Sequence, residues 1–569
     1  MAQTLVDTDV LIVGAGPTGL SAACELARQG VDFRIVEKLE KASDRSKALV
    51  VHSRTLELLK SIGCVEKFLE FGTKLGGMNI YDEGKRIAHI SLTHVDSPYQ
   101  FALSIPQYDT EKLLYDQMRA SSKVDVERQK ELFKLEQQDD CVVASVRKAD
   151  GTEEHIKARY VIASDGAHST GRKQINEQFV GGEYADGFML ADVLVDWNGH
   201  KTEGELHAFS GAGGTVAFFP MLNGYWRVLL VVLPDEAPEG TEPTLEDVQD
   251  RVNKICPWGL KLTQPVWLAN FKVRYRKVDH YRNNRVFLAG DSAHIHSPVG
   301  GQGMNTGMHD AFNLSWKIAL AVKGFASEAL LDSYHSERHA VAEQLLKMVD
   351  LMTRVNLLRA PVARKLRNAI APLIIQQEPI QQRMGSFISQ VAVNYRHSPV
   401  VRESRRSLVS ATVAAKSDVE PQLNEWLDFA HGPQPGDRAP DCQITDLKNG
   451  NITDVLTLMR TGKHVLLLLT GDKPSDNEYK ELAELGKKAV AAYGPLLDAH
   501  LISSEKTIPE GVGWSGNAYT DPDFTLEERY GAGSSCVYLI RPDGYIGFRG
   551  QPVNFDGLKE YFDKICRTK

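Results

Sequence analysis

A chain of 569 residues is longer than a single hydrophobic core usually supports, so we expect two or three domains. The apolar content of 42% is sufficient for large cores, and the net charge of −8 argues against a nucleic-acid-binding surface. The polar segment Met1–Asp9 and the shortness of the apolar runs predict a cytoplasmic protein without a signal peptide or stable membrane insertion. Seven scattered cysteines without a CxxC pair predict reduced thiols, and no metal site is expected.

The N-terminal segment carries the glycine pattern of a dinucleotide-binding loop. An apolar run at Val10–Val13 precedes the glycines, an alanine-rich helical stretch follows them, and a second apolar run ends at Glu37. Such glycines allow a tight turn and close approach of a pyrophosphate, and an acid about 20 residues further on binds a ribose hydroxyl. The predicted cofactor-binding residues of this segment are Gly14, Gly16, Gly19, Glu37 and Lys38.

A second candidate site lies in the segment Arg285–Lys317. The apolar strand Val286–Ala289 leads into Asp291, a loop rich in proline and glycine follows, and a helix is predicted to begin near Asn305. A carboxylate at a strand end, a loop of bare backbone and a helix N-terminus together suit a polyhydroxylated, anionic ligand.

The chain is predicted to form an α/β fold built from several units. Residues 1–178 and 283–350 are expected to form one Rossmann-type domain, interrupted at 179–282 by a β-rich insertion with alternating and β-branched runs at 188–195, 215–219 and 226–232. A helical connection is expected at 351–430. Its basic residues favour a solvated or dimer-facing surface, with membrane attachment as the alternative: Arg354, Arg359, Arg364, Lys365, Arg367, Arg402, Arg405 and Arg406.

A boundary rich in proline and glycine at Gly432–Pro440 introduces the last unit, residues 431–569. Apolar strands are predicted at 464–469 and 537–540, and a helix at 478–492. The second strand ends in the predicted turn Arg541–Gly544.

Three segments together resemble the class A FAD-dependent aromatic hydroxylases: the glycines after Val13, the run Tyr160–Arg172 and the segment around Asp291. They occur in the order of that family, although Ser164 stands where many members have cysteine. The resemblance implies an FAD cofactor, with Asp291 at the ribityl chain and the glycine loop at the pyrimidine side of the flavin ring. It also implies cofactor roles for Arg45, Gln107, Asp165, Pro298, Gly301, Gly303, Met304 and Asn305. For Arg45 the alternative is a surface charge, and for Gln107 a helix-start residue.

The resemblance extends to the remaining units. It implies that the β-rich insertion is the substrate domain, and that residues 431–569 form the thioredoxin-like domain of the phenol-hydroxylase branch. Without a CxxC dithiol this domain is expected to be structural and part of a homodimer interface. In that family NADPH or NADH reduces the flavin, O2 adds to give a C4a-hydroperoxyflavin, and an aromatic substrate takes up one oxygen atom.

The residues that assist the chemistry are harder to name from sequence. A free phenol has a pKa of about 10, so a proton acceptor or relay helps at neutral pH. The candidates are His52, Tyr225 and Arg227, each with a structural role as the alternative, while Pro298 is expected to line the site. The main prediction is hydroxylation of a phenolic or aromatic compound. The alternatives are epoxidation or Baeyer–Villiger oxidation, for example of a polyketide, and a non-oxygenating FAD-binding protein.

Overall fold

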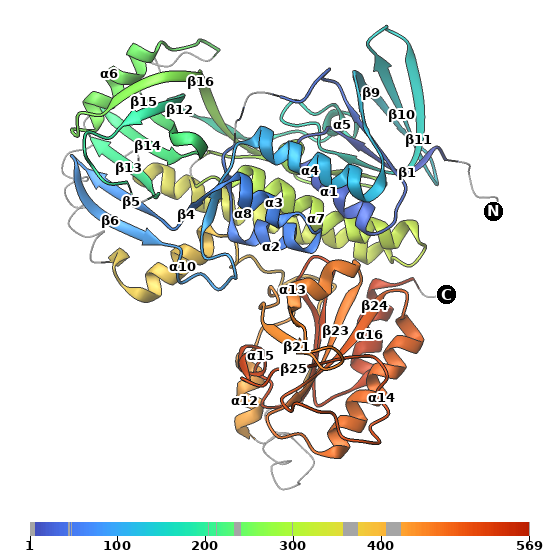
Figure 1. Cartoon of the computed structure of the whole chain (residues 1–569). Helices are drawn as coiled ribbons and strands as arrows, with labels where there is room; N and C mark the ends of the chain where they lie inside the picture. Colours follow the sequence, from blue (N-terminus) through green and yellow to red (C-terminus); the bar gives the residue numbers. More distant parts are fainter. Residues whose placement is uncertain are drawn as a thin grey trace.

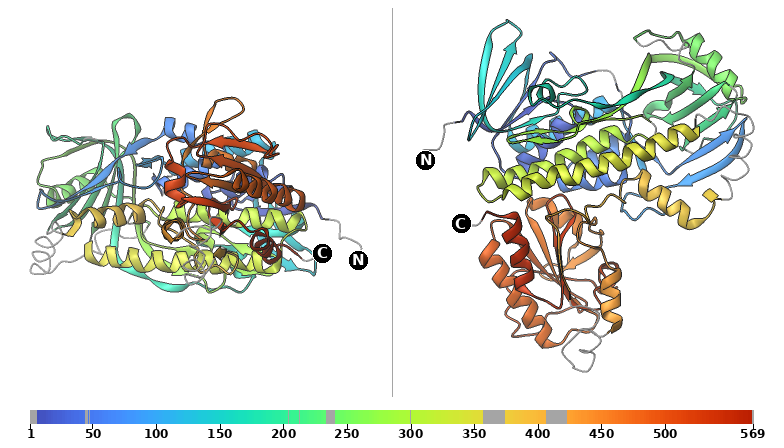
Figure 2. Two further views of the ribbon diagram at one scale, coloured as in Figure 1. Left: turned by 90° about the horizontal axis from the view of Figure 1, so that it is seen from below. Right: turned by 180° about the vertical axis from the view of Figure 1, so that it is seen from behind.

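The computed structural model describes residues 6–43, 46, 48–202, 204–211, 213–232, 240–298, 300–356, 374–405 and 423–567. Two sheets lie in the upper part of the molecule as drawn in Figure 1, and the C-terminal unit lies below them. The long helices α7 (Gly303–Val322) and α8 (Glu328–Asn356) run between the upper part and the C-terminal unit (Figure 2). Within the described ranges, every helix is too short or too polar to cross a bilayer.

The first sheet brings the sequence motifs together. Val13 of β1 lies beside Val36 of β2 and Ala163 of β11, and Ala163 lies beside Leu288 of β18, all in parallel pairing. Because the carboxyl ends of parallel strands meet at one edge, the loops after these strands are neighbours. The strand order is β17 (Arg282–Asn283), β18 (Val286–Leu288), β11 (Glu153–Ala163), β1 (Thr8–Val13), β2 (Phe33–Glu37) and β8 (Val126–Arg128). In addition, β10 (Val142–Lys148) pairs with β11, and β9 (Lys130–Gln137) pairs with β10.

Helices pack against this sheet and contain several of the predicted site residues. Helix α1 (Pro17–Arg28) packs against both α7 and α4 (Gln107–Ser122). Short strands β3 (Val50–Val51), β7 (Ala102–Ser104) and β4 (Thr73–Leu75) form a small separate sheet. The remaining helices of this region are α2 (Ser53–Ser61), α3 (Val65–Phe71), α5 (Thr170–Gln174) and α10 (Glu378–Ile388).

The second sheet is larger than the predicted insertion. It takes the hairpin β5–β6 from before residue 179, because β13 pairs in parallel with β5, and it takes β19 from after residue 282. The strands predicted near 188–195, 215–219 and 226–232 are confirmed as parts of β12, β14 and β15. The order is β19 (His294–Ile295), β16 (Lys261–Lys277), β12 (Val180–Asp196), β15 (Tyr225–Val232), β14 (Gly214–Pro220), β13 (Leu206–Gly211), β5 (Gly77–Asp82) and β6 (Lys85–Ser91), with α6 (Leu245–Ile255) packed on one face.

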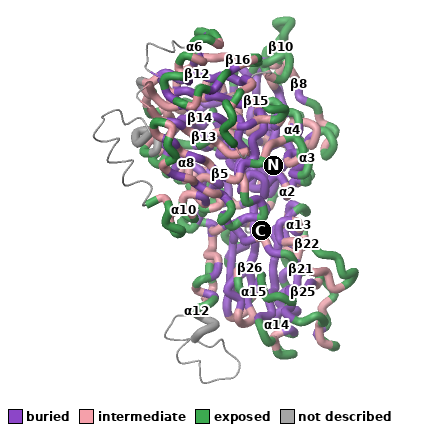
Figure 3. The backbone as a smooth tube through the Cα atoms, turned by 60° about the vertical axis from the view of Figure 1, so that its left-hand side comes forward, coloured by how far each residue is buried: buried purple, intermediate pink, exposed green. Residues whose placement is uncertain are grey.

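The C-terminal unit has its own sheet and core. Parallel strands β23 and β24 are joined by α14, and the antiparallel pair β26–β27 is followed by α16, with the spatial order β24-β23-β26-β27. This arrangement supports the thioredoxin-like prediction. Figure 3 shows the central strands of this sheet buried. The elements are β21 (Gln443–Asp446), β22 (Ile452–Asp454), α13 (Val455–Leu458), β23 (His464–Gly471), α14 (Asp476–Tyr493), β24 (Leu497–Ser503), β25 (Asn517–Thr520), α15 (Thr525–Tyr530), β26 (Ser534–Ile540), β27 (Ile546–Gln551) and α16 (Phe555–Ile565).

The predicted helical connection at 351–430 needs a correction. Arg402 and Arg405 lie in a strand, β20 (Arg402–Arg405), which pairs in parallel with β27 at the edge of the C-terminal sheet. The pairing partner is about 145 residues away in the sequence, so no local pattern indicates it. Helix α12 (Leu423–His431) follows later. Of the other basic residues, Arg359, Arg364, Lys365, Arg367 and Arg406 lie outside the described residues.

Buried charges join the C-terminal unit to the body. Arg541 is fully buried and donates from both terminal nitrogens to Glu337 of α8, at 2.7 and 2.9 Å. Lys317 of α7 donates to the same carboxylate at 2.7 Å. Burial lowers the pKa of Lys317 to about 8, whereas Arg541 and Lys317 outweigh burial and hold the pKa of Glu337 far below its usual range. The interface therefore depends on complete pairing of these charges.

Replacing Arg541 tests this dependence. The substitution Arg541→Met removes the main partner of a buried carboxylate, so we expect a loss of about 3–5 kcal/mol of stability. The exposed pair Lys559–Asp563 in the same unit gives a matched control, and Lys559→Met should leave the unfolding midpoint unchanged. Thermal unfolding of the three proteins measures the difference. Equal midpoints for Arg541→Met and the wild type would contradict the assignment.

Candidate active site

The first glycine loop has two tightly packed glycines and one open position. A Cβ on Gly14 would lie 2.4 Å from the carbonyl oxygen of Ser164, and one on Gly19 would lie 1.9 Å from that of Gly14. A Cβ on Gly16 would meet no atom within 4 Å. Gly14 and Gly19 are thus required by packing, whereas Gly16 borders the space in which a pyrophosphate would lie.

Glu37 orients this loop. It ends β2, and its carboxylate accepts hydrogen bonds from the backbone N–H of Ala15 at 2.9 Å and of Leu39 at 3.0 Å. The predicted ribose-binding acid is therefore held beside the glycines by the loop itself. Lys38 is exposed next to it, and Arg45 lies outside the described residues.

Two long helices begin at the site without a cap. For α1, which begins after Gly16, and α7, which begins after Gln302, no side chain of the described residues caps the N-terminus, and the first turn contains no acid. Both ends therefore keep unsatisfied N–H groups and a partial positive charge, which suits a pyrophosphate and an anionic ring edge. Together with the open space at Gly16, this arrangement fits FAD.

A buried acid supports the turn that carries Asp291. Gly290 has φ +61° and its N–H donates to Asp310 of α7 at 3.0 Å, while Asp291 itself is exposed. His294 and Arg338 also bind the Asp310 carboxylate, each at 2.7 Å. Burial opposes ionisation of Asp310, but Arg338 and His294 outweigh it and lower its pKa to about 2. His294 thus supports the loop.

Asp165 binds protein groups. Its carboxylate accepts from the hydroxyls of Ser169 and Ser292 and from the N–H groups of Thr170 and Gly171 at the start of α5. Ser292 adjoins Asp291, so the second and third motifs are joined directly. Among the neighbouring motif residues, Gly166 donates its N–H to Ser292 at 3.0 Å, and Arg172 donates to the carbonyl of Ser292 and stacks 3.7 Å from the ring centroid of Phe179.

The second glycine loop with the first turn of α7 (residues 300–305, called the flavin loop below) is held by side chains at the start of α2 and of α7. The Nε2 atom of His52 lies 3.0 Å from the carbonyl oxygen of Gly300. The amide of Asn305 donates to the carbonyls of Val50 and Gly301, each at 2.8 Å, and accepts from the His52 N–H at 2.9 Å. Asn305 therefore fixes the loop with its side chain, which leaves its backbone for the predicted flavin contact.

The other residues predicted for this loop follow its course. Pro298 accepts the N–H of Gly301 at 2.9 Å, and Gly301 packs against Val50. Gly303 begins α7, and a Cβ on it would lie 3.5 Å from the ring of His296. Met304 is half-buried against the core of the first sheet.

Gln107 starts α4 and joins two segments near the cofactor edge. Its N–H donates to Ser46 at 2.8 Å, its side-chain oxygen accepts from Ala48 at 3.2 Å, and its amide donates to Glu111 at 2.8 Å. Gln107 is therefore the first residue of a helix, as the alternative predicted. Its contact with the ribityl chain stays a prediction.

The second sheet presents Arg227 on the face opposite α6. Trp226 and Val228 pack into the core on the α6 side, so Arg227 between them points to the other face, which Tyr225 shares. Arg227 is 3% exposed, and its Nε and Nη2 atoms each donate to Asp192 at 2.8 Å. Its Nη1 atom is buried without a partner among the described residues.

Two observations relate this face to the cofactor edge. Tyr108 follows Gln107 in the first turn of α4, and its pKa is raised by burial and by Asp109 and Asp192, with Arg227 acting in the opposite direction. The Asp192–Arg227 pair therefore lies near the start of α4. In addition, Phe219 packs against the cluster of the small sheet that contains Val50, the residue in contact with Gly301.

Sequence reasoning missed the supporting residues of the site. Asp192 and Arg338 belong to no recognised motif, and Asp310 lies in the predicted Arg285–Lys317 segment without an assigned role; each acts through a partner on a different element. For Asp192 the available signal was a charge inside an apolar run, since charged residues are rarely buried unless they are paired.

Gly16→Ala tests the position of the pyrophosphate. The added methyl group meets no protein atom, so the FAD-free protein should keep its unfolding midpoint, while FAD binding weakens about tenfold or more, roughly 1.4 kcal/mol. Gly76→Ala, also without a neighbour within 4 Å, is the control. Titration with FAD measures both variants. Unchanged affinity in Gly16→Ala would contradict the placement.

His52 should make stability depend on pH. Burial lowers its pKa to about 4, so the unfolded chain binds a proton between about pH 6.5 and 4 that the folded protein does not. Stability therefore falls as the pH decreases through this range, by about 2 kcal/mol from this residue between pH 7 and 5. We expect His52→Asn to reduce the fall of the unfolding midpoint, and the exposed His431→Asn to leave it unchanged. Equal falls in both variants would exclude this role.

Comparison with known proteins agrees with this geometry. The family model "FAD binding domain" matches residues 7–349, and "Aromatic-ring hydroxylase, C-terminal" matches residues 432–567. Pentachlorophenol 4-monooxygenase of Sphingobium chlorophenolicum is 30% identical over 98% of this chain and 97% of its own length. The 6-methylpretetramide 4-monooxygenase of Streptomyces rimosus is 31% identical over 95% of this chain and 90% of its own.

A solved structure matches over nearly the whole chain. Anhydrotetracycline hydroxylase from Streptomyces rimosus has a TM-score of 0.73 and 27% sequence identity, covering 98% of this chain and 99% of its own. The fold is therefore shared over both the N-terminal part of the chain and the C-terminal unit. The chain belongs to the family of FAD-dependent aromatic-ring monooxygenases.

Proposed function

We propose that this monooxygenase hydroxylates a phenolic ring, with NADPH or NADH as the reductant and O2 as the oxygen source. The observation that carries the phenolic assignment is the unpartnered, buried Nη1 atom of Arg227 on the face turned toward the cofactor edge. A buried guanidinium N–H without a partner is costly, and the oxygen of an ionised phenol is a fitting acceptor.

Different residues of the protein are proposed to bind the flavin and to exclude water from it. When bound, FAD supplies the activation of O2 and the transfer of one oxygen atom to the ring. The backbone of Gly16, the starts of α1 and α7, and Asp291 hold the cofactor. The apolar residues around Val50 and Phe219 exclude water, which protects a reactive oxygen species from decay.

Arg227 is the residue proposed to favour the ionised phenol. Asp192 holds two of its nitrogens, so the direction of Nη1 is fixed before the substrate arrives. A nearby fixed positive charge lowers the pKa of a bound phenol, which makes the ring a better nucleophile. Tyr225 shares the face and is proposed to line the substrate space.

His52 fits a positioning role better than a basic one. Its ring is neutral at physiological pH because burial lowers its pKa, and it contacts the Gly300 carbonyl of the flavin loop. Pro298, which closes the turn to Gly301, is proposed to line the ring edge through its backbone. The homodimer stays a prediction.

The name of one relative supports a phenolic substrate. Pentachlorophenol 4-monooxygenase is named for a phenol, and it aligns over 98% of this chain. Arg227 is proposed to act on the aromatic hydroxyl itself. The proposal therefore covers single phenols and larger ring systems alike.

A screen of phenols tests the proposal. The holoenzyme should oxidise NADPH faster when a suitable phenol is present, and the product mass should increase by one oxygen atom. The matching methyl ethers serve as controls, because they lack an ionisable hydroxyl. If no phenol stimulates NADPH oxidation, or ethers act equally well, the phenolic assignment is wrong.

Arg227→Lys tests the anchor. Lysine keeps the positive charge for Asp192 but lacks a second nitrogen for the substrate. We expect kcat/KM for phenols to fall about tenfold to a hundredfold, since a hydrogen bond to a charged group contributes about 1.5–3 kcal/mol. The pH at which kcat rises should also increase, because kcat reports the ionisation of groups in the enzyme–substrate complex, and FAD affinity should not change. A loss of FAD affinity instead would place Arg227 at the flavin.

A further inference from the structure

We propose that the C-terminal unit fixes the position of the flavin-binding loop through the turn Arg541–Gly544, with Arg54 and Glu57 as positioning residues. The unit is built around a separate sheet, yet this turn extends from the end of β26 into the body of the molecule. The proposal concerns bound FAD and holds whatever the substrate is.

The first connection runs through the start of α2. His52, at the N-terminal end of the helix, contacts Gly300 and Asn305 of the flavin loop. Two residues later, the fully buried Arg54 donates from Nη2 to the carbonyl oxygen of Asp543 at 2.7 Å. The same helical turn therefore contacts the flavin loop on one side and the C-terminal turn on the other.

The second connection runs through α7. Asn305 lies at the flavin end of this helix, and Asn313 lies about two turns further along. The Asn313 amide donates to the carboxylates of Asp543 at 3.1 Å and of Glu337 at 2.7 Å. Both helices that support the loop are thus held by the Arg541–Gly544 turn.

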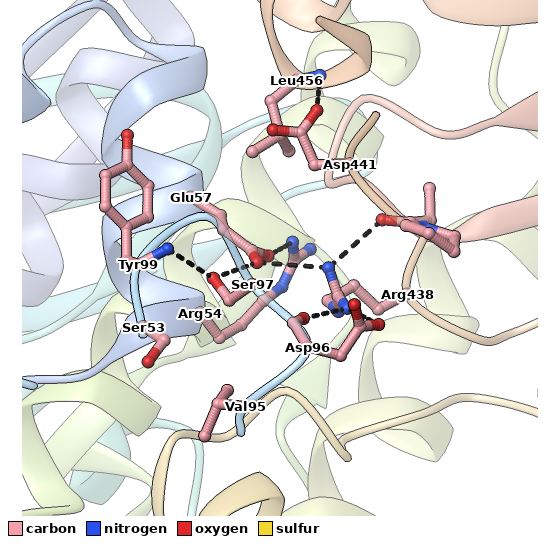
Figure 4. A network of polar contacts seen from close by, with 12 residues as sticks. Ser53, Arg54, Glu57, Val95, Asp96, Ser97, Tyr99, Arg438, Asp441 and Leu456 are labelled. Carbon is pink, nitrogen blue, oxygen red and sulfur yellow. Dashed lines mark hydrogen bonds and ion pairs between the residues drawn. The ribbon is translucent and has the colours of Figure 1, made fainter. Parts of the chain in front are cut away.

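A third set of contacts reaches α2 from the beginning of the C-terminal unit. In Figure 4 the buried carboxylate of Glu57 receives hydrogen bonds from Arg54 at 2.7 Å, Ser97 at 2.8 Å and Arg438 at 3.1 Å. Arg438 also binds Asp96. Glu57 therefore joins the first turns of α2 to two separate segments.

These contacts leave little room for independent movement. Breaking one exposes an uncompensated charge in a dry interior, so the helices and the turn must shift together. Gly544 shows how close they are: it has φ +78°, and a Cβ there would lie 2.8 Å from Nη2 of Arg54. A side chain at this position would displace the guanidinium of Arg54, which binds Glu57 and Asp543, and the terminal methyl of Met459.

Gly544→Ala is the direct test. Gly450→Ala is its matched control, because Gly450 lies in the same unit with φ +74° and a Cβ there would meet nothing within 4 Å. Both variants carry similar backbone strain, and Gly544→Ala adds the close contact with Arg54, so the unfolding midpoint should fall in both variants and further in Gly544→Ala. Only Gly544→Ala should shift the visible spectrum of bound flavin and raise the FAD dissociation constant about fivefold or more.

With an active phenol, Gly544→Ala should also convert a larger share of the NADPH consumed into H2O2 than Gly450→Ala does. FAD affinity and the flavin spectrum need no substrate, so a failure of the phenolic assignment is distinguishable from a failure of this proposal. If Gly544→Ala lowers the unfolding midpoint but leaves the flavin spectrum and FAD affinity as in Gly450→Ala, the turn is merely structural and the proposal is overturned.

A second pair of variants covers the case in which Gly544→Ala does not fold. Arg438→Gln removes a contact to Glu57, whereas Lys60→Gln removes the contact of Lys60 with Asp454 at the far end of the same helix. We expect weaker FAD binding in Arg438→Gln, recovery in Arg438→Lys, and wild-type binding in Lys60→Gln. Equal FAD affinity in Arg438→Gln and Lys60→Gln would also overturn the proposal.

Discussion

The parallel pairing of β2, β1, β11 and β18 is the constraint on which the site depends. Parallel strands end at one edge, so loops separated by more than a hundred residues become neighbours. Glycines in these loops then allow the backbones to approach more closely than a residue with a Cβ would permit. Gly14 lies against the backbone of Ser164, and Gly290 lies against Thr18 at the start of α1. The cofactor edge is therefore an interlocked set of turns.

Buried charges give that edge its rigidity. Asp310 holds the turn before Asp291, and Arg338 and His294 keep it ionised in a dry environment. Such groups are costly to bury alone, but complete pairing makes displacement of any one of them equally costly. The flavin loop itself contains few side chains, so its geometry comes from neighbours such as His52 and Asn305.

The same principle extends to the C-terminal unit. Arg541 and Glu337 join it to the helices that begin at the flavin loop, and Glu57 joins it to α2. The C-terminal unit has no CxxC dithiol, which the redox chemistry of a thioredoxin requires. What the structure shows instead are the charged contacts between this unit and the body of the enzyme.

The cofactor motifs could be predicted from the sequence, because the spacing of glycines and acids around strands reflects a local turn geometry. The sequence also predicted β1, β18, β15 and α14 at nearly their observed limits, since their apolar patterns are strong. Strand pairings between segments far apart in the sequence were not predicted. These are the hairpin β5–β6 in the second sheet and β20 beside β27. Three features are seen only in the folded chain: the Asp192–Arg227 pair, the contacts of Asp310 and those of the Arg541–Gly544 turn. Each of these depends on which charges meet in space, and a charged side chain carries no local mark of its distant partner.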